Sequence, residues 1–345
     1  MTTNDLTARD AITALKELLP ALSADILAPG DFHERLAPAI SQYSALLFKA
    51  TNITTDEPAT RENVITTYGK AIGTLWAGMC VDQPMRTQRF CRGLYKAIAD
   101  RLAQNPGGLV HVVYAGTGPF AALALPVMMQ FEPGQLQFTL LEINNQSYAI
   151  LKRLLNALGL DSYVRRIELC DATQWKAPDE DIDIVISETM NKALIKEPQV
   201  CIMLNMAKQL PPAVTYIPTE IKVNVAWFKN YQTEPTPLIQ LCNFNRESYL
   251  KIVERCASEP DWIFEPVIFN YTPIDGGRLV YTTDITVYRD EKLGYNDCSL
   301  NLIEKIRSPV PTQPALLQFK YGFNPSPGFA CTVLQDDIAF ASNTY

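Results

Sequence analysis

The stretch from 107 to 217 constrains the fold most, because short apolar runs alternate there with amphipathic segments. The runs that we expect to be buried strands are 109–116, 136–143, 165–170 and 181–188. The segments between them place apolar residues at spacings of three and four, which is typical of helices. These expected helices span 119–131, 145–160 and 197–210. Strand and helix alternating at this pace predict an α/β domain with a parallel sheet covered by helices.

The two flanking regions have different patterns. Residues 1–106 show helical spacing, with helices expected at 5–22, 32–50, 60–79 and 86–104. Residues 218–345 shift towards a period of two, which predicts a C-terminal domain of antiparallel strands. Those strands are expected at 267–274, 277–290, 298–306, 315–323 and 330–340, with a polar, partly helical insert at 230–262.

Composition excludes some classes of partner. The net charge is −7, whereas phosphate binding requires a basic face, so we expect no nucleic-acid partner. The N-terminus has charges where a signal peptide has an apolar core, and no later run is long enough to span a bilayer. None of the eight cysteines stands in a C-x-x-C pair, so no metal site is expected, and scattered cysteines fit a reducing compartment. We therefore expect a cytoplasmic protein without membrane contacts.

Three features at successive strand ends predict a nucleoside site. A glycine turn with Gly116 and Gly118 follows the first strand, and a helix expected to begin near Pro119 would offer free N–H groups. Glu142 ends the second strand, where an acid can accept both ribose hydroxyls. Asp171 follows the third strand and is in position to bond an adenine amino group. S-adenosylmethionine fits better than a dinucleotide, since the third glycine of G-x-G-x-x-G is missing.

Two glutamates follow the fourth expected strand in the stretch SETMNKALIKE. Glu188 and Glu197 are nine residues apart at the edge of the sheet where binding clefts form. A guanidinium ion presents its N–H donors in a rigid fork that suits carboxylates. Two converging carboxylates could hold such a cation, although strand-end glutamates are usually solvated loop residues.

With these residues the chain resembles the class I S-adenosylmethionine-dependent methyltransferases, and specifically the protein arginine methyltransferase family. The family pattern of the double-glutamate loop is matched without a gap by Ser187, Glu188, Met190, Leu194 and Glu197. Segments 210–221 and 85–90 also resemble family segments. The order of helices, parallel sheet and β-domain matches as well, so the resemblance touches roughly 60–345.

The resemblance implies a fold and a set of roles. It implies a helical domain at 1–106, a Rossmann-like methyltransferase domain at 107–217 and a β-barrel-like domain at 218–345. Glu188 and Glu197 would be catalytic and would bind the substrate together with Met190 and Tyr68. The residues implied to bind S-adenosyl-L-methionine are Arg86, Tyr114, Gly116, Gly118, Glu142, Asp171 and Ala172. The family commonly forms homodimers, and the insert at 230–262 is a candidate dimerisation arm.

Departures from the family pattern bear on the substrate. Val112 and Tyr114 replace the acid and the first glycine of the glycine motif, and the C-terminal Thr-His-Trp loop is absent. The paired-tyrosine segment is partly present around Tyr68. We therefore expect arginine methylation with free L-arginine or a small guanidino metabolite as substrate. The alternatives are an enzyme for arginine in peptides or proteins and a non-catalytic member that binds the cofactor and interacts with partners.

Overall fold

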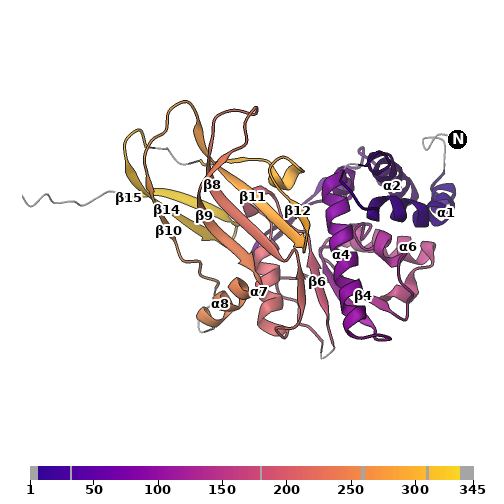
Figure 1. The fold of residues 1–345 in the computed structure, drawn as a ribbon. Coiled ribbons are helices and arrows are strands. Elements are labelled where there is room, and N and C mark those ends of the chain that lie inside the picture. Colours follow the sequence, from indigo (N-terminus) through magenta and orange to yellow (C-terminus); the bar gives the residue numbers. More distant parts are fainter. Residues whose placement is uncertain (1–6, 32, 179–180, 258–260, 308–310, 335–345) are drawn as a thin grey trace, which may run out of the picture.

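The structure, a computed structural model, describes residues 7–31, 33–178, 181–257, 261–307 and 311–334. Three regions follow one another along the chain, as Figure 1 shows: N-terminal helices, a parallel sheet with covering helices, and antiparallel sheets at the other end. The order expected from the sequence is confirmed. One large cluster of buried apolar side chains runs through all three regions.

The parallel sheet has the strand order β5-β4-β3-β6-β7. Its strands are β3 (Val110–Ala115), β4 (Leu136–Glu142), β5 (Val164–Leu169), β6 (Ile184–Ser187) and β7 (Thr215–Ile217). All four neighbouring pairs are parallel. The associated helices are α5 (Leu125–Met128), α6 (Asn145–Leu158), α7 (Gln199–Gln209) and the short η4 (Asp161–Tyr163) and η5 (Lys192–Leu194). Every residue of β3 is buried, as a central parallel strand requires.

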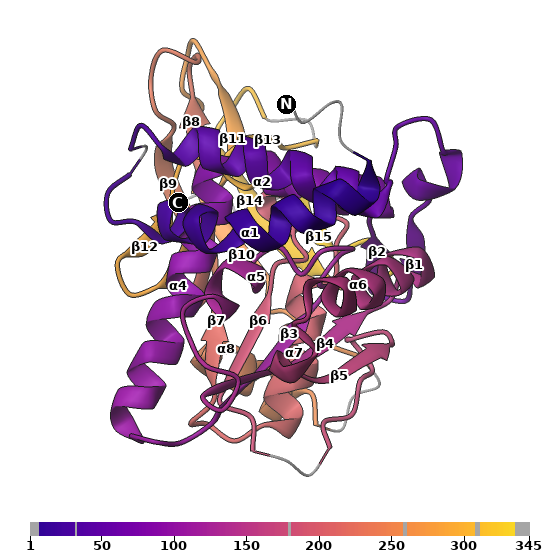
Figure 2. The ribbon, with the colours of Figure 1, turned by 90° about the vertical axis from the view of Figure 1, so that its right-hand side faces the viewer.

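Within the described residues, the N-terminal region contains four α-helices, two short 3₁₀ helices and a hairpin. Its elements are α1 (Ala8–Leu27), α2 (Leu36–Thr51), η2 (Pro58–Arg61), β1 (Val64–Thr66), β2 (Gly69–Ala71), α3 (Thr74–Met79), η3 (Cys80–Asp82) and α4 (Pro84–Gln104). Figure 2 shows α1 and α2 side by side above the parallel strands. The helix expected over 60–79 is wrong for its first half, because β1 and β2 pair antiparallel there. Consecutive β-branched residues and Gly69 favour this hairpin over a helix.

The C-terminal region consists of two antiparallel sheets within the described residues. One has the order β12-β11-β8-β9 with β13 on β11, and the other is β10-β14-β15. The elements are β8 (Glu220–Phe228), β9 (Thr236–Asn245), α8 (Arg246–Arg255), β10 (Val267–Tyr271), β11 (Arg278–Tyr288), β12 (Glu291–Leu293), η6 (Ser299–Asn301), β13 (Glu304–Lys305), β14 (Ala315–Gly322) and β15 (Gly328–Leu334). Aromatic contacts such as Tyr281–Phe319 join the two sheets, so the barrel-like domain is built from two packed layers.

Three expectations for this region need correction. The strand expected at 298–306 is wrong for its first half, because η6 occupies Ser299–Asn301 and the strand β13 comprises only Glu304–Lys305. The segment 230–262 does not interrupt the strands as an insert, because β9 pairs with β8 over most of its length and α8 packs on α7. Pro237 made this segment look unlike a strand in the sequence, because proline cannot donate a hydrogen bond to a neighbouring strand. The proline is tolerated here because β9 lies at the edge of its sheet. The expected strand at 330–340 is observed up to Leu334, and its remainder lies outside the described residues.

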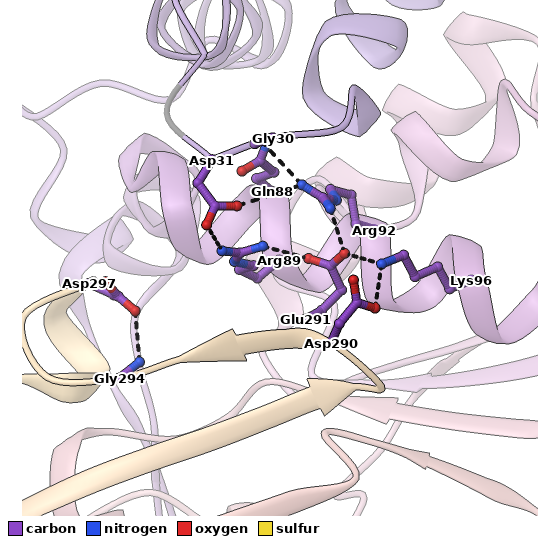
Figure 3. Close-up of polar contacts among 10 residues, drawn as sticks. All are labelled: Gly30, Asp31, Gln88, Arg89, Arg92, Lys96, Asp290, Glu291, Gly294 and Asp297. Carbon is purple, nitrogen blue, oxygen red and sulfur yellow. Dashed lines mark hydrogen bonds and ion pairs between the residues drawn. The ribbon is translucent and has the colours of Figure 1, made fainter.

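Helix α4 joins the β-domain to the rest of the molecule through a buried ion cluster, drawn in Figure 3. Glu291, at the start of β12, is fully buried. Its Oε2 accepts from Arg89 at 3.0 Å, and its Oε1 contacts Arg92 at 2.8 Å and Lys96 at 2.5 Å. Asp31, between α1 and α2, pairs with Arg89 at 2.5 Å. We call these five residues the Glu291 cluster; it fixes α4 between the N-terminal helices and the β-domain.

Candidate active site

A cavity of about 270 Å³ opens at the carboxyl edge of the parallel sheet. The strand order changes direction here, since β4 and β5 extend from one side of β3 while β6 and β7 extend from the other. Ligands of open α/β sheets bind at such a point. The loops after β3, β4, β5 and β6 line the cavity, and parts of segment 66–87 together with Ser299 and Leu300 close it from other sides.

The turn after β3 brings both predicted glycines to the cavity. Gly116 and Gly118 have φ angles of 75° and 61°, which favour glycine. The helix expected over 119–131 is wrong for its first part, because residues 119–124 form turns and α5 begins at Leu125. The Ala122 carbonyl accepts from the Tyr43 hydroxyl at 3.0 Å instead of from a helical N–H. A glycine turn, rather than a helix N-terminus, therefore faces the cavity.

Val112 and Tyr114, the two residues that depart from the family's glycine motif, differ in whether they line the cavity. Tyr114 lines the cavity at the end of β3 with a ring that is 4% exposed, and burial raises the pKa of its hydroxyl well above the ordinary value. Val112 is fully buried within β3 and does not line the cavity. The tyrosine therefore adds a wall where the family pattern has a glycine.

The predicted nucleoside-binding acids also lie on the cavity. Glu142 Oε2 accepts from the Gly118 N–H at 2.7 Å, and its Oε1 accepts from the Asn144 N–H at 2.8 Å. Burial raises the pKa of this carboxyl, and the backbone donors oppose the rise. Asp171 and Ala172 line the cavity after β5, and Asp171 Oδ1 accepts from the Thr173 N–H at 2.9 Å. The structure thus brings Gly118, Glu142 and Asp171 to one cavity.

Glu188 lies directly after β6, and its side chain is only 7% exposed. Its Oε2 accepts from Arg86 Nε at 2.8 Å and also from Arg86 Nη2. Burial raises the pKa of Glu188, and the Arg86 guanidinium opposes this rise. The other oxygen, Oε1, is buried and has no hydrogen-bond partner among the described residues. A buried carboxylate oxygen without a donor is costly, so this atom marks a position where a ligand donor is missing.

Glu197 is the second carboxylate of the pair and lines the same cavity. Burial, and then the nearby Glu188 carboxylate, raises the pKa of Glu197 to about 7, against the opposing effects of Arg86 and Lys70. Met190 lies between the two glutamates in the sequence. It is 3% exposed and also lines the cavity. The structure therefore unites Glu188, Met190 and Glu197, as the spacing of the motif predicts.

The loop that carries these glutamates has an unusual backbone. Ala193, Leu194 and Lys196 have φ angles of 52°, 54° and 68°, which non-glycine residues rarely adopt. Hydrogen bonds from outside the loop hold it: Ala193 N–H donates to Thr283 Oγ1 at 2.8 Å, and the Tyr321 hydroxyl donates to the Leu194 carbonyl at 2.8 Å. The β-domain therefore helps to set the direction in which Glu197 points.

The β1–β2 hairpin is also hydrogen-bonded to this loop. The Lys196 carbonyl accepts from the Lys70 N–H at 2.9 Å. A Cβ at Gly69 would lie 2.5 Å from the same carbonyl oxygen, so this close approach requires glycine. Tyr68, predicted to bind substrate, lies on the hairpin but is not among the residues that line the cavity. Its pKa is raised by burial and by the nearby Asp261 carboxylate.

Arg86 reaches the cavity from α4, as predicted, but its guanidinium faces Glu188. The sequence could not show this pairing, because the two residues are 102 positions apart. Sequence reasoning also missed several lining residues, namely Thr66, Lys70, Cys80, Gln83, Ser299 and Leu300. The first two were hidden by the incorrect helix at 60–79. No signal in the sequence marked Ser299 and Leu300, which arrive on η6 from the β-domain.

Within the described ranges there is no cluster of histidine, cysteine or acidic side chains that could hold a metal ion. Over the same ranges, none of the helices combines the length and apolar character needed to cross a bilayer.

Comparisons with known proteins define the class to which the fold belongs. No family model matches the sequence, and no curated protein matches it significantly. Among solved structures, the PRMT1 enzyme–prozyme heterotetrameric complex with AdoHcy from Trypanosoma brucei matches with a TM-score of 0.50 at 12% identity, covering 73% of this chain and 90% of that one. Protein arginine methyltransferase 10 of Arabidopsis thaliana, in an open conformation, gives 0.47 at 11% identity, covering 74% and 96%. The first match confirms that the chain has the fold found in arginine methyltransferases.

Proposed function

We propose that this protein is an S-adenosylmethionine-dependent N-methyltransferase that acts on the guanidino nitrogen of arginine. The substrate would be free L-arginine or a small guanidino metabolite. The observation that carries this proposal is the buried Oε1 of Glu188, which has no donor among the described residues. It lies in a cavity at the sheet edge that the half-buried carboxylate of Glu197 also lines. A cation with several N–H donors would satisfy that oxygen and relieve the repulsion between Glu188 and Glu197.

The residues around the cavity fit the cofactor. Glu142 and Asp171 offer carboxylates at the ends of β4 and β5, in the order that a ribose and an adenine would need. Gly116 and Gly118 line the cavity without side chains of their own, so a ligand can approach the backbone of the turn after β3. Arg86 also lines the cavity, and it would meet the carboxylate of the cofactor's methionine moiety only through a nitrogen that does not contact Glu188. When bound, S-adenosylmethionine would supply an electrophilic methyl group on its sulfonium sulfur.

The two glutamates would orient and activate the guanidinium. Glu188, held by Arg86, would accept N–H bonds through its Oε1 and fix one terminal nitrogen. Together the carboxylates would attract positive charge away from that nitrogen and leave it more nucleophilic. When the nitrogen gains a methyl group it must lose a proton. Glu197 is the favoured acceptor, because its pKa of about 7 suits proton transfer near neutral pH.

The walls of the cavity support a small substrate. The β1–β2 hairpin lies against the double-glutamate loop, and η6 closes the cavity from the β-domain through Ser299 and Leu300. The histidine loop that protein-directed relatives use is missing from the sequence. Both features favour free arginine over an arginine held in a long peptide.

A mass-spectrometric assay with S-adenosylmethionine would test the proposal, with L-arginine and an arginine-rich peptide offered side by side. Methylated L-arginine with an unchanged peptide supports the proposal as stated. Methylated peptide alone replaces it with the protein-modifying activity. If neither reacts although calorimetry shows cofactor binding, the guanidino assignment is wrong. Glu188→Gln and Glu197→Gln should each lower the rate at which the methylated product forms by about 100-fold or more.

A further inference from the structure

We propose that Lys70, on the β1–β2 hairpin, binds the carboxylate of the substrate, so that the preferred substrate is a guanidino acid. This inference rests on the proposed function and specifies the substrate class. In this role the hairpin would recognise the part of the substrate that the double-glutamate motif does not contact.

The cavity contains an excess of negative charge. Glu142, Asp171, Glu188 and Glu197 line it, and the cationic lining residues are Lys70 and Arg86. Arg86 already contacts Glu188 with two of its nitrogens. Lys70 forms neither an ion pair nor a side-chain hydrogen bond with any described residue, and it is therefore available to a ligand.

Lys70 is held close to the place where a guanidinium would bind. Its backbone N–H donates to the carbonyl of Lys196, the residue before Glu197. The glycine at position 69 allows this approach, since any side chain there would collide with that carbonyl. The ammonium group also lowers the pKa of Glu197, which places the two charges within electrostatic reach.

A fixed ammonium beside a guanidinium site has a clear consequence for specificity. It repels any substrate whose only charge is positive, such as a decarboxylated arginine analogue. It attracts a substrate that carries a carboxylate a few methylene groups away from the guanidinium. The lysine would therefore reduce binding of simple guanidines and favour amino acids or short guanidino acids.

The experiment compares four compounds of matched length: L-arginine, 5-guanidinopentanoate, L-arginine amide and agmatine. We expect the two carboxylates to have kcat/KM values about 10- to 100-fold above those of the other two, the range expected for one charge-assisted hydrogen bond. Lys70→Met should remove this preference by lowering kcat/KM for the carboxylates, and Lys70→Arg should keep most of it. Lys152→Met, at an exposed position on α6, controls for the loss of one positive charge.

The outcomes separate this inference from the proposed function. If all four compounds react equally and Lys70→Met changes none of them, the role of Lys70 is refuted while guanidino methylation stands. If Lys70→Met lowers all four rates by the same factor, the lysine is not a carboxylate site and the inference is likewise refuted. If no guanidino compound reacts with enzyme that binds the cofactor, the proposed function fails and the inference fails with it. Unchanged thermal melting and cofactor affinity of Lys70→Met would show that the variant is folded.

Discussion

Two buried glutamates face the same helix in very different ways. Glu291 meets Arg89, Arg92 and Lys96 of α4, and both of its oxygens are bonded. Glu188 meets Arg86, one turn earlier on α4, and among the described residues only its Oε2 is bonded. Both carboxylates are removed from water, so both require partners. The first has all of them within the protein, and the second does not.

The difference separates a structural ion cluster from a candidate binding site. A buried carboxylate with all partners in place holds three regions of the fold together and has no capacity for a ligand. A buried carboxylate that lacks a donor, beside a second one with a raised pKa, is typical of functional sites. Helix α4 carries the cationic partners of both carboxylates.

The largest effect on stability is expected at Glu291. Glu291→Gln would replace the buried carboxylate that Arg89, Arg92 and Lys96 share with a neutral amide, and only the exposed Asp31 and Asp290 would remain as their anionic partners. Breaking such a buried cluster costs about 3 to 5 kcal/mol. Urea unfolding monitored by circular dichroism would measure this loss. The folded fraction should keep kcat/KM within about threefold of the wild type. A variant that unfolds at the wild-type urea concentration would contradict the structural role of the cluster.

The complementary change is at Glu188. Glu188→Gln should lower kcat/KM for the guanidino substrate about 100- to 1000-fold, as for removal of one preorganised charged group from an active site. Its stability loss should be smaller than that of Glu291→Gln, because the glutamine oxygen can still accept from Arg86. Both quantities would be measured on the same preparations. Wild-type kcat/KM in this variant would remove Glu188 from the mechanism.

The sequence predicts the parts of this arrangement that depend on local pattern. Apolar runs identify the strands of the parallel sheet, and strand ends identify Glu142, Asp171 and Glu188 because parallel strands finish at one edge. The nine-residue spacing identifies Glu197. The pattern failed at 64–71, where the helical spacing of apolar residues outweighed the β-branched residues and Gly69 that favour a hairpin. Contacts of this hairpin with the distant Lys196 could not be seen in the sequence.

Contacts between distant segments could not be read from the sequence. The Arg86–Glu188 pair, the Glu291 cluster and the arrival of η6 at the cavity all join residues far apart in the chain. Such contacts depend on how the three regions pack against one another, and the spacing of apolar residues along the chain does not predict that packing. The edge strand β9 was also missed, because a proline and polar residues make it resemble a loop.

A third prediction uses pH to distinguish the two kinds of carboxylate. The folded pKa of Glu197 is about 7 and its ordinary value is 4.5, so the folded state binds more protons than the unfolded state between these values. The wild type should therefore lose stability as pH rises from about 4.5 to 7. Glu197→Gln should match the wild type near pH 4 and exceed it above pH 7 by up to about 3 kcal/mol.

Urea unfolding at pH 5 and pH 8 would measure this difference, with Glu17→Gln on the exposed face of α1 as the control for removing one carboxylate. In the wild type, kcat/KM should rise with pH through about 7 as Glu197 ionises in the free enzyme. A stability gain for Glu197→Gln that is equal at both pH values would show that burial does not hold this carboxyl protonated.

The smallest expected effect concerns two tyrosines in the same aromatic layer of the β-domain. The Tyr321 hydroxyl donates to the Leu194 carbonyl in the double-glutamate loop, whereas the buried Tyr281 hydroxyl finds no hydrogen-bond partner in the part of the chain that the structure describes. Tyr321→Phe should cost about 1 kcal/mol and lower kcat/KM several-fold, because the strained loop loses an anchor. Tyr281→Phe, the matched control, should be neutral or slightly stabilising, since it removes an unsatisfied group. Equal effects of the two substitutions would mean that the hydroxyl at Tyr321 does not position the loop, and that the aromatic packing alone determines both results.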